Sequence, residues 1–273
     1  MYILNYLQII QMGCSSSVDF ATLNSQNENG NTNLMRHLMS ADEYDGSHVL
    51  NIIRQHGESD IAVPPINYDL QNNKGETLLM LACRRHRDKL VTHILTQDID
   101  VNICDVMGFS AIYFSRTLTL TKAIMKHKSF ADKSMDYTRL ANYLMNTNCY
   151  NIAQYIVENK NITFAGDKVE SIFISICTRG SGQLFAIYIY KKYYVPHTLS
   201  AARYLTLLTH AGKYHNDLVN VIFDDIATKL TPTDTMSIRM QHENQILKQE
   251  IKKLHSSVNS LQSAVSNIPT HYS

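Results

Sequence analysis

Hydrophobic residues recur along this chain mainly at intervals of three and four, which is the period of amphipathic helices. Between residues 72 and 104 a polar turn precedes two such segments, at 77–83 and 90–95. Further pairs of apolar segments follow at 137–145 with 151–158, 169–177 with 183–190, and 199–209 with 217–230. This pattern predicts an all-α fold built from helical hairpins.

Three Gly-x-Thr/Ser triplets begin at Gly30, Gly75 and Gly108, and the last two lie 33 residues apart. Glycine accepts the positive φ of a tight turn, and the following hydroxyl can cap a helix. A turn with one helix pair cannot bury its apolar face alone, so such units must stack on one another. We therefore expect repeats near 27–67, 72–104 and 105–130, with surface insertions at 40–46 and 57–65 in the first.

The central repeat resembles the ankyrin repeat. The matching residues are Gly75, Thr77, Leu79, Ala82, the pairs Leu90/Val91 and Ile94/Leu95, and the closing Asp100-Val101-Asn102. Leu78 and Met80 stand where the family usually has proline and histidine, whereas Gly30, Thr32 and Gly108 mark the neighbouring repeats. The resemblance implies a helical-hairpin solenoid that binds a protein partner, similar to the degenerate ankyrin proteins of large DNA viruses.

The hairpin rhythm and the fading of the motif divide the chain into four parts. We expect a flexible leader at 1–26, ankyrin-like repeats at 27–130, degenerate helical-hairpin repeats at 131–230 and a coiled coil at 236–268. An unrelated helical domain is the alternative for the third part. Pro232, with Thr231 and Thr233 beside it, predicts a hinge and the N-terminal boundary of the last helix.

The last helix carries a heptad pattern of apolar residues. Leu247, Leu254 and Leu261 fall at d, and Ile251, Val258 and Val265 fall at a, an arrangement that favours parallel dimers. Asn244 occupies another a position, where a buried amide fixes register. This pattern predicts a homodimer through residues 236–268. The alternative is a capping helix that packs back on the last hairpin.

The segment 12–17 fits the M-G-x-x-x-[ST] pattern for N-myristoylation, with Cys14 beside Gly13 for a palmitoyl chain. The motif is active only if Met12 is the initiator, because the reaction needs a free amino group on Gly13. Otherwise it is internal and inert within a serine-rich leader. We expect a cytoplasmic protein, associated with the cytoplasmic face of a membrane only if Gly13 and Cys14 are acylated.

Composition narrows the chemistry that this chain could carry. Among its 273 residues, 25 basic and 24 acidic side chains give a formal net charge of +1, so no nucleic-acid partner is expected. The five cysteines lack metal-ligand spacing, and Cys83 with His86 and His93 matches no zinc motif. Asp224 and Asp225 are expected on a helix surface. We expect no cofactor, no metal and no catalytic residue.

A basic segment joins the two helices of the central repeat. Arg84, Arg85 and Arg87, together with Lys74 and Glu76 in the turn, are the partner-binding candidates. Forked guanidinium groups suit an acidic or phosphorylated partner. The function expected is a non-catalytic protein-interaction adaptor; the alternatives are a regulatory or inhibitory subunit and, more weakly, an enzyme in the 131–230 region.

Overall fold

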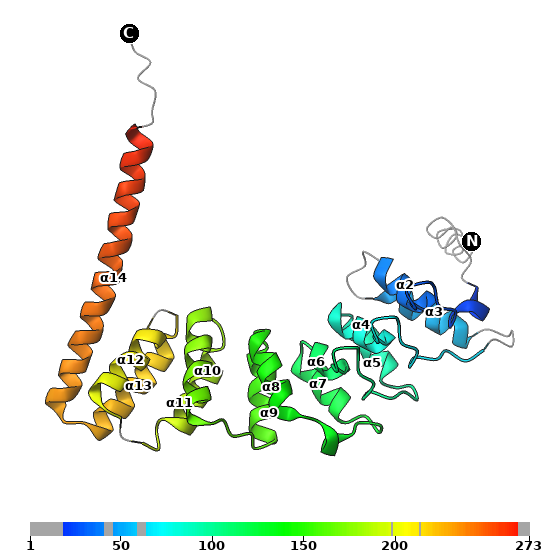
Figure 1. Cartoon of the computed structure of the whole chain (residues 1–273), viewed down its shortest axis with the longest axis horizontal. Coiled ribbons are helices and arrows are strands. Elements are labelled where there is room, and N and C mark those ends of the chain that lie inside the picture. Colours follow the sequence, from blue (N-terminus) through cyan, green and yellow to red (C-terminus); the bar gives the residue numbers. More distant parts are fainter. Residues whose placement is uncertain (1–18, 41–45, 59–63, 198, 213, 267–273) are drawn as a thin grey trace, which may run out of the picture. The chain divides into compact units, whose positions relative to one another are not determined.

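The computed structural model describes residues 19–40, 46–58, 64–197, 199–212 and 214–266 (Figure 1). Within these ranges the secondary structure is helical, and the only β-type pairings are isolated bridges between Gln26 and Thr32 and between Cys104 and Ser110. The all-α prediction is confirmed. The chain divides into two compact units, the first ending at Tyr143 and the second beginning at Leu144.

The first unit consists of helical hairpins connected by polar turns. Its elements are η1 (Phe20–Thr22), α2 (Asn33–Ser40), α3 (Ser47–Gly57), α4 (Leu78–Arg84), α5 (Asp88–Ile94), α6 (Ala111–Phe114), α7 (Leu118–Met125), η2 (Asp132–Ser134) and most of α8 (Tyr137–Asn146). Helices α2, α4 and α6 contact one another in turn, and so do α3, α5 and α7. Each hairpin thus buries its apolar faces against the next one.

The second unit continues with longer hairpins and ends in one long helix. Its helices are α9 (Tyr150–Asn159), α10 (Gly166–Arg179), α11 (Gln183–Tyr193), α12 (Ala201–Ala211), α13 (Asn216–Lys229) and α14 (Pro232–Ser266). Helix α10 contacts α12, α11 contacts α13, and both α12 and α13 contact α14. Phe173, Phe185, Tyr190 and Tyr204 are the largest side chains buried in this unit.

The folded part begins before residue 27, where the leader was expected to end. Leu23 is buried, and Asn24 bonds across the first hairpin, donating to the Pro65 carbonyl and accepting from the Asn67 amide. These bonds join segments more than 40 residues apart, which no local pattern reveals. Residues 19–26 therefore belong to the first hairpin.

The boundary between the units also differs from the expected division at 130/131. Tyr143 packs its ring against Phe109 and Tyr113, with centroids 5.1 and 5.4 Å apart. The guanidinium of Arg139 lies 4.7 Å above the Phe109 ring. Most of α8 therefore packs on the turn that contains Phe109 and on the hairpin of α6 and α7. The boundary between the two units accordingly lies after Tyr143.

Helix α14 starts at Pro232, as the helix-boundary signal at this proline predicted. Proline suits the first helical position because its fixed φ is helical and no N–H is needed there. The Thr231 hydroxyl accepts a hydrogen bond from the Asp234 amide at 3.2 Å and donates to the Asp234 carboxylate at 2.6 Å. Thr231 thus caps the helix.

Candidate interaction surfaces

Three turns of the first unit share one hydrogen-bonding pattern. Asn72 Oδ1 accepts from the amides of Lys74 and Glu76, and the Gly75 amide donates to the Asn72 carbonyl. The turns at Asn27 and Asp105 make the same bonds at the same offsets. Gly30, Gly75 and Gly108 all have positive φ, near +71°, +75° and +75°, as their sequence positions predicted.

The turns are also bonded to one another. Gln71 Nε2 donates to the Gly75 carbonyl of its own turn and to the Cys104 carbonyl of the next, at 2.6 and 2.9 Å. Gln26 repeats this pair of bonds one turn earlier. A Cβ on Gly75 would lie 2.8 Å from the Val106 amide nitrogen, so the turns approach too closely for a side chain there. The three turns form a continuous polar edge.

Arg139 ends this stack of turns. The carbonyls of Asn29 and Lys74 each accept an amide from the following turn, whereas the equivalent Met107 carbonyl accepts Arg139 Nη2 at 2.9 Å. A guanidinium from α8 therefore takes the place that a fourth turn would occupy. Sequence analysis did not identify this role, because Arg139 lies in a segment without the repeat motif.

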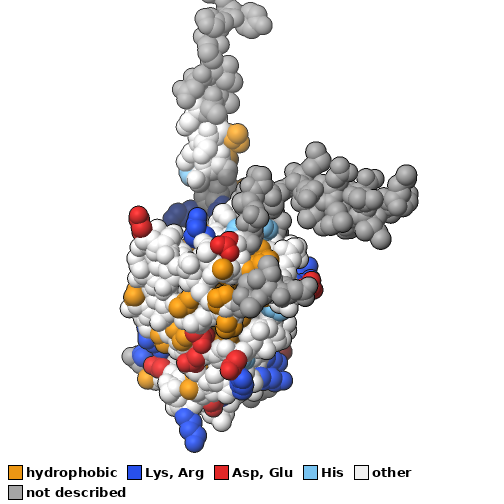
Figure 2. Space-filling view, turned by 90° about the vertical axis from the view of Figure 1, so that its right-hand side faces the viewer, with side chains coloured by type: hydrophobic (Ala, Val, Ile, Leu, Met, Phe, Trp, Pro, Cys, Tyr) orange, Lys and Arg blue, Asp and Glu red, His pale blue; other side chains and the backbone are white. Residues whose placement is uncertain are grey.

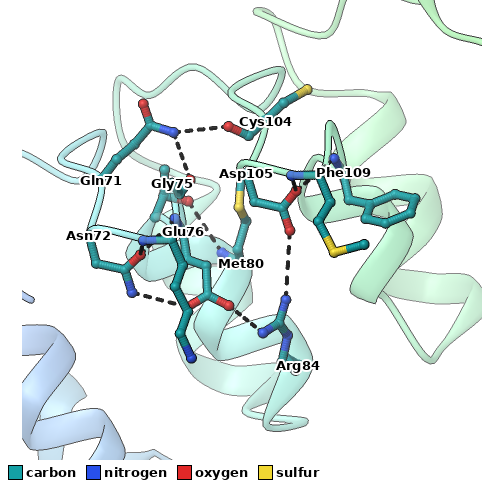
Figure 3. Close-up of polar contacts among 12 residues, drawn as sticks. Gln71, Asn72, Gly75, Glu76, Met80, Arg84, Cys104, Asp105 and Phe109 are labelled. Carbon is teal, nitrogen blue, oxygen red and sulfur yellow. Dashed lines mark hydrogen bonds and ion pairs between the residues drawn. The ribbon is translucent and has the colours of Figure 1, made fainter. Parts of the chain in front are cut away.

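A partly buried ionic network joins the second turn to the third (Figure 3). The Glu76 carboxylate accepts from Asn72 Nδ2 at 3.0 Å and pairs with the Arg84 guanidinium. The second guanidinium nitrogen of Arg84 lies 3.9 Å from Asp105 Oδ2, and the guanidinium carbon lies 4.3 Å from the centre of the Phe114 ring. The side chains of Glu76 and Asp105 are only 6% and 7% exposed.

This network changes the set of partner-binding candidates. Glu76 is buried and fully engaged, so its carboxylate does not face a partner, and Arg84 is committed to two interior carboxylates. Lys74 is exposed, and Arg85 and Arg87 are partly exposed. Lys74, in the turn before α4, and Arg85 and Arg87, after α4, remain the basic partner-binding candidates. Burial of Glu76 was not predictable, because the guanidinium that pairs with it lies 8 positions away in the sequence, at Arg84.

The other repeat-defining residues have structural positions. The hydroxyls of Thr32 and Thr77 accept from the amides of Met35 and Met80, which caps α2 and α4. Leu79 and Ala82 lie in the core. Asn102 accepts from the Ala131 amide at 2.8 Å and so fixes the segment after α7.

No group of three or more potential metal ligands occurs among the described residues. Cys83, Cys104, Cys149 and Cys177 are free thiols, and burial raises the pKa of Cys83 and of Cys177 to about 12. Two such deeply buried thiols are poor nucleophiles at neutral pH, since the reactive form is the thiolate.

The first turns of α14 pack against α12 and α13 through one face. Ile238 and His242 are buried there, and the Arg239 guanidinium lies 4.9 Å above the Phe223 ring. Gln245 Oε1 accepts from the Thr209 hydroxyl at 2.8 Å. In the heptad frame these four residues occupy positions b, c and f.

The opposite face of α14 is an exposed apolar stripe, which we call the α14 seam. The side chains of Leu247, Ile251, Leu254, Val258 and Leu261 are 48–66% exposed. Met240, one heptad before Leu247, is 53% exposed on the same face. Eight of the twelve large hydrophobic side chains that are exposed in the described part of the chain belong to α14. Contiguous exposed apolar surface of this kind marks interaction sites. Asn244 is exposed within the seam, whereas the side chain of Val265 lies outside the described residues.

His242 is the buried titratable group at the base of α14. Its Nδ1 has no hydrogen-bond partner, and its ring stands 5.8 Å from Phe223 in an edge-on arrangement. Burial lowers the pKa of His242 below its ordinary value of 6.5, with an opposing contribution from Glu243. The folded chain therefore holds this imidazole neutral against α12 and α13.

We expect the free energy of unfolding of the second unit to decrease as the pH falls below about 6.5. In this range His242 binds a proton in the unfolded chain more readily than in the folded chain, where its pKa is lowered. At pH 7.5 the effect disappears because the imidazole is neutral in both states. Urea unfolding at pH 7.5 and 5.5 would measure it. In a His242→Phe variant the free energy of unfolding should decrease less between these pH values than in the wild-type chain. A His197→Gln variant, changed at an exposed site, should decrease as much as the wild-type chain does. Equal decreases in all three chains would contradict this role of His242.

A second buried network lies between α11, α12 and α13. Asp225 Oδ2 accepts from the hydroxyls of Tyr190 and Tyr204 at 2.8 and 3.2 Å, and its Oδ1 lies 2.8 Å from Lys229 Nζ. Burial, followed by the Asp225 charge, raises the pKa of Tyr204 to about 12. Burial, followed by the hydrogen bond to Asp225, raises the pKa of Tyr190 above its ordinary value of 10. The expectation that Asp225 lies on a helix surface is wrong; only Asp224 is exposed. The tyrosines lie 21 and 35 residues away, so sequence spacing gave no sign of the cluster.

Charge on the outer surface is mixed. On the face seen in Figure 2, acidic and basic side chains are interspersed over the described residues.

The acylation residues Gly13 and Cys14 lie outside the described residues. No helix of the described chain is long and apolar enough to cross a membrane.

No protein-family model matches the chain, and no curated protein matches it.

Proposed function

We propose that this chain is a non-catalytic protein-interaction adaptor of the ankyrin-repeat class, dimerised by a coiled coil that α14 forms with a second copy. The observation that carries the proposal is the α14 seam, whose apolar side chains continue in heptad register beyond the part of the helix that packs on α12 and α13. The stacked turns support the repeat class, because three turns make the same bonds at the same offsets. In this proposal the molecule is a helical-hairpin solenoid, with reduced thiols that suit the cytoplasm.

The capping-helix and dimer alternatives use different faces of α14. Positions b, c and f contact α12 and α13, whereas positions a and d remain exposed. One helix can therefore cap its own hairpins and pair with another copy.

The dimer is tested by placing charge in the seam. We expect the full chain, 31.1 kDa per copy, to have the mass of two copies in light scattering, and a Leu247→Asp/Leu254→Asp variant to have the mass of one. A Ser256→Asp/Ser263→Asp variant carries the same added charge on the outer face and should remain a dimer. A monomeric wild-type chain would overturn the dimer.

In this proposal an acidic partner binds the basic side chains of Lys74, Arg85 and Arg87. An oligoglutamate peptide, as an acidic probe, should bind the full chain in fluorescence anisotropy and bind several-fold more weakly when these three residues are alanine. The binding should weaken as salt is added, because exposed charges are screened. A Lys252→Ala/Lys253→Ala variant should bind the peptide as the wild-type chain does. Equal binding by all variants would contradict an acidic partner at Lys74, Arg85 and Arg87.

A further inference from the structure

We infer that the second copy on the α14 seam lies parallel and in register, and that the interface begins in the first turns of α14. This inference rests on the proposed dimer and adds its orientation and its extent. It follows from which faces of α14 are occupied and from the signs of the charges beside the seam.

The seam continues into the first turns of α14, where the predicted segment 236–268 begins. Thr233 and Ser237 are exposed on the same face as Met240, and together with Met236 and Asn244 they line a shallow groove. Methionine side chains adapt to irregular contacts, which suits an interface flanked by small polar residues. Packing on α12 and α13 leaves this whole face uncovered.

Charges beside the seam distinguish the two orientations. Glu243 and Glu250 occupy g positions, whereas Lys248 and His255 occupy e positions, and all four are exposed. In a parallel pair, g of one helix faces the following e of its partner, which sets Glu243 against Lys248 and Glu250 against His255. In an antiparallel pair g faces g and e faces e, so acidic groups would oppose acidic groups. The observed signs favour the parallel pair.

Asn244 fixes the register of this pair. At an a position of a parallel dimer, each amide meets its twin and the two can bond to one another. A register shifted by one heptad would set the Asn244 amide of one copy against Ile251 of the other and leave that amide unpaired, which is costly in a buried interface.

Mixing wild type with a charge-swapped chain tests the orientation. The swapped chain carries Glu243→Lys, Glu250→Lys, Lys248→Glu and His255→Glu, and native mass spectrometry at low salt counts homodimers and heterodimers. A parallel pair sets like charges together only in the heterodimer, so its share should fall below the one half that random exchange gives. A share above one half would show antiparallel pairing and overturn the inference, while a monomeric wild-type chain would instead overturn the proposed dimer.

A single charge near the base tests the extent. Met240→Asp should raise the dimer dissociation constant at least tenfold, whereas Ser256→Asp on the outer face should leave it unchanged. If the wild-type chain dimerises and Met240→Asp leaves the dissociation constant unchanged, the interface starts beyond residue 240 and this part of the inference is overturned.

Discussion

Replacing Asp225 with alanine should lower the free energy of unfolding of the second unit by about 3–5 kcal/mol, the cost of breaking a buried ion pair by removing one partner. The change strips Lys229 of its carboxylate and leaves the hydroxyls of Tyr190 and Tyr204 buried without an acceptor. Lys229 is only 18% exposed, so water replaces the lost partner poorly. Urea unfolding followed by circular dichroism would measure the loss.

The adjacent residue supplies the control for this experiment. Asp224 has the same side chain on the same helix but is exposed, and Asp224→Ala should change the free energy of unfolding by less than about 0.5 kcal/mol. An Asp225→Asn variant keeps the shape and one acceptor oxygen, so its loss should be intermediate. Equal effects of Asp224→Ala and Asp225→Ala would show that the network contributes no more than an exposed carboxylate.

The spacing of apolar residues by three and four predicted most of the helices, because residues at this spacing share the buried face of a helix. Residues 137–145 were expected as a helix and form α8 from Tyr137 to Asn146; residues 217–230 were expected and form α13 from Asn216 to Lys229. The Thr77 cap was predicted for the same reason, since its partner Met80 lies three residues away. Features whose parts are close in sequence were therefore accessible.

The polar networks could not be predicted from local sequence spacing. Arg84 reads as one cation in a basic run, yet its guanidinium lies between carboxylates at positions 76 and 105. Arg139 replaces a turn that the sequence does not contain, and Asp225 joins helices that are far apart in the chain. Each role depends on the register in which hairpins stack, which the apolar period leaves undetermined. The same holds for the two faces of α14, where only the packed structure shows which residues the hairpins cover.

Removal of the Arg84 guanidinium should destabilise the first unit by about 2–3 kcal/mol, less than the ~3–5 kcal/mol of a fully buried pair because its side chain is 44% exposed. Arg84→Ala leaves the carboxylates of Glu76 and Asp105 facing each other across the space between two turns. Arg84→Lys keeps the charge but loses the fork that reaches both carboxylates, so its loss should be smaller. Amide hydrogen exchange in α4 and α6 of the full chain would localise the effect.

A double-mutant cycle separates this network from general loss of packing at residue 84. With Glu76→Gln one of the two buried carboxylates beside Arg84 is neutralised, so adding Arg84→Ala should cost at least about 1 kcal/mol less than it does in the wild-type chain. Arg85→Ala, a neighbouring arginine outside the network, should leave exchange in α4 unchanged. If Arg84→Ala costs the same in the Glu76→Gln background as in the wild-type chain, the guanidinium stabilises the unit through its contacts with Asp105 and Phe114 and not through Glu76.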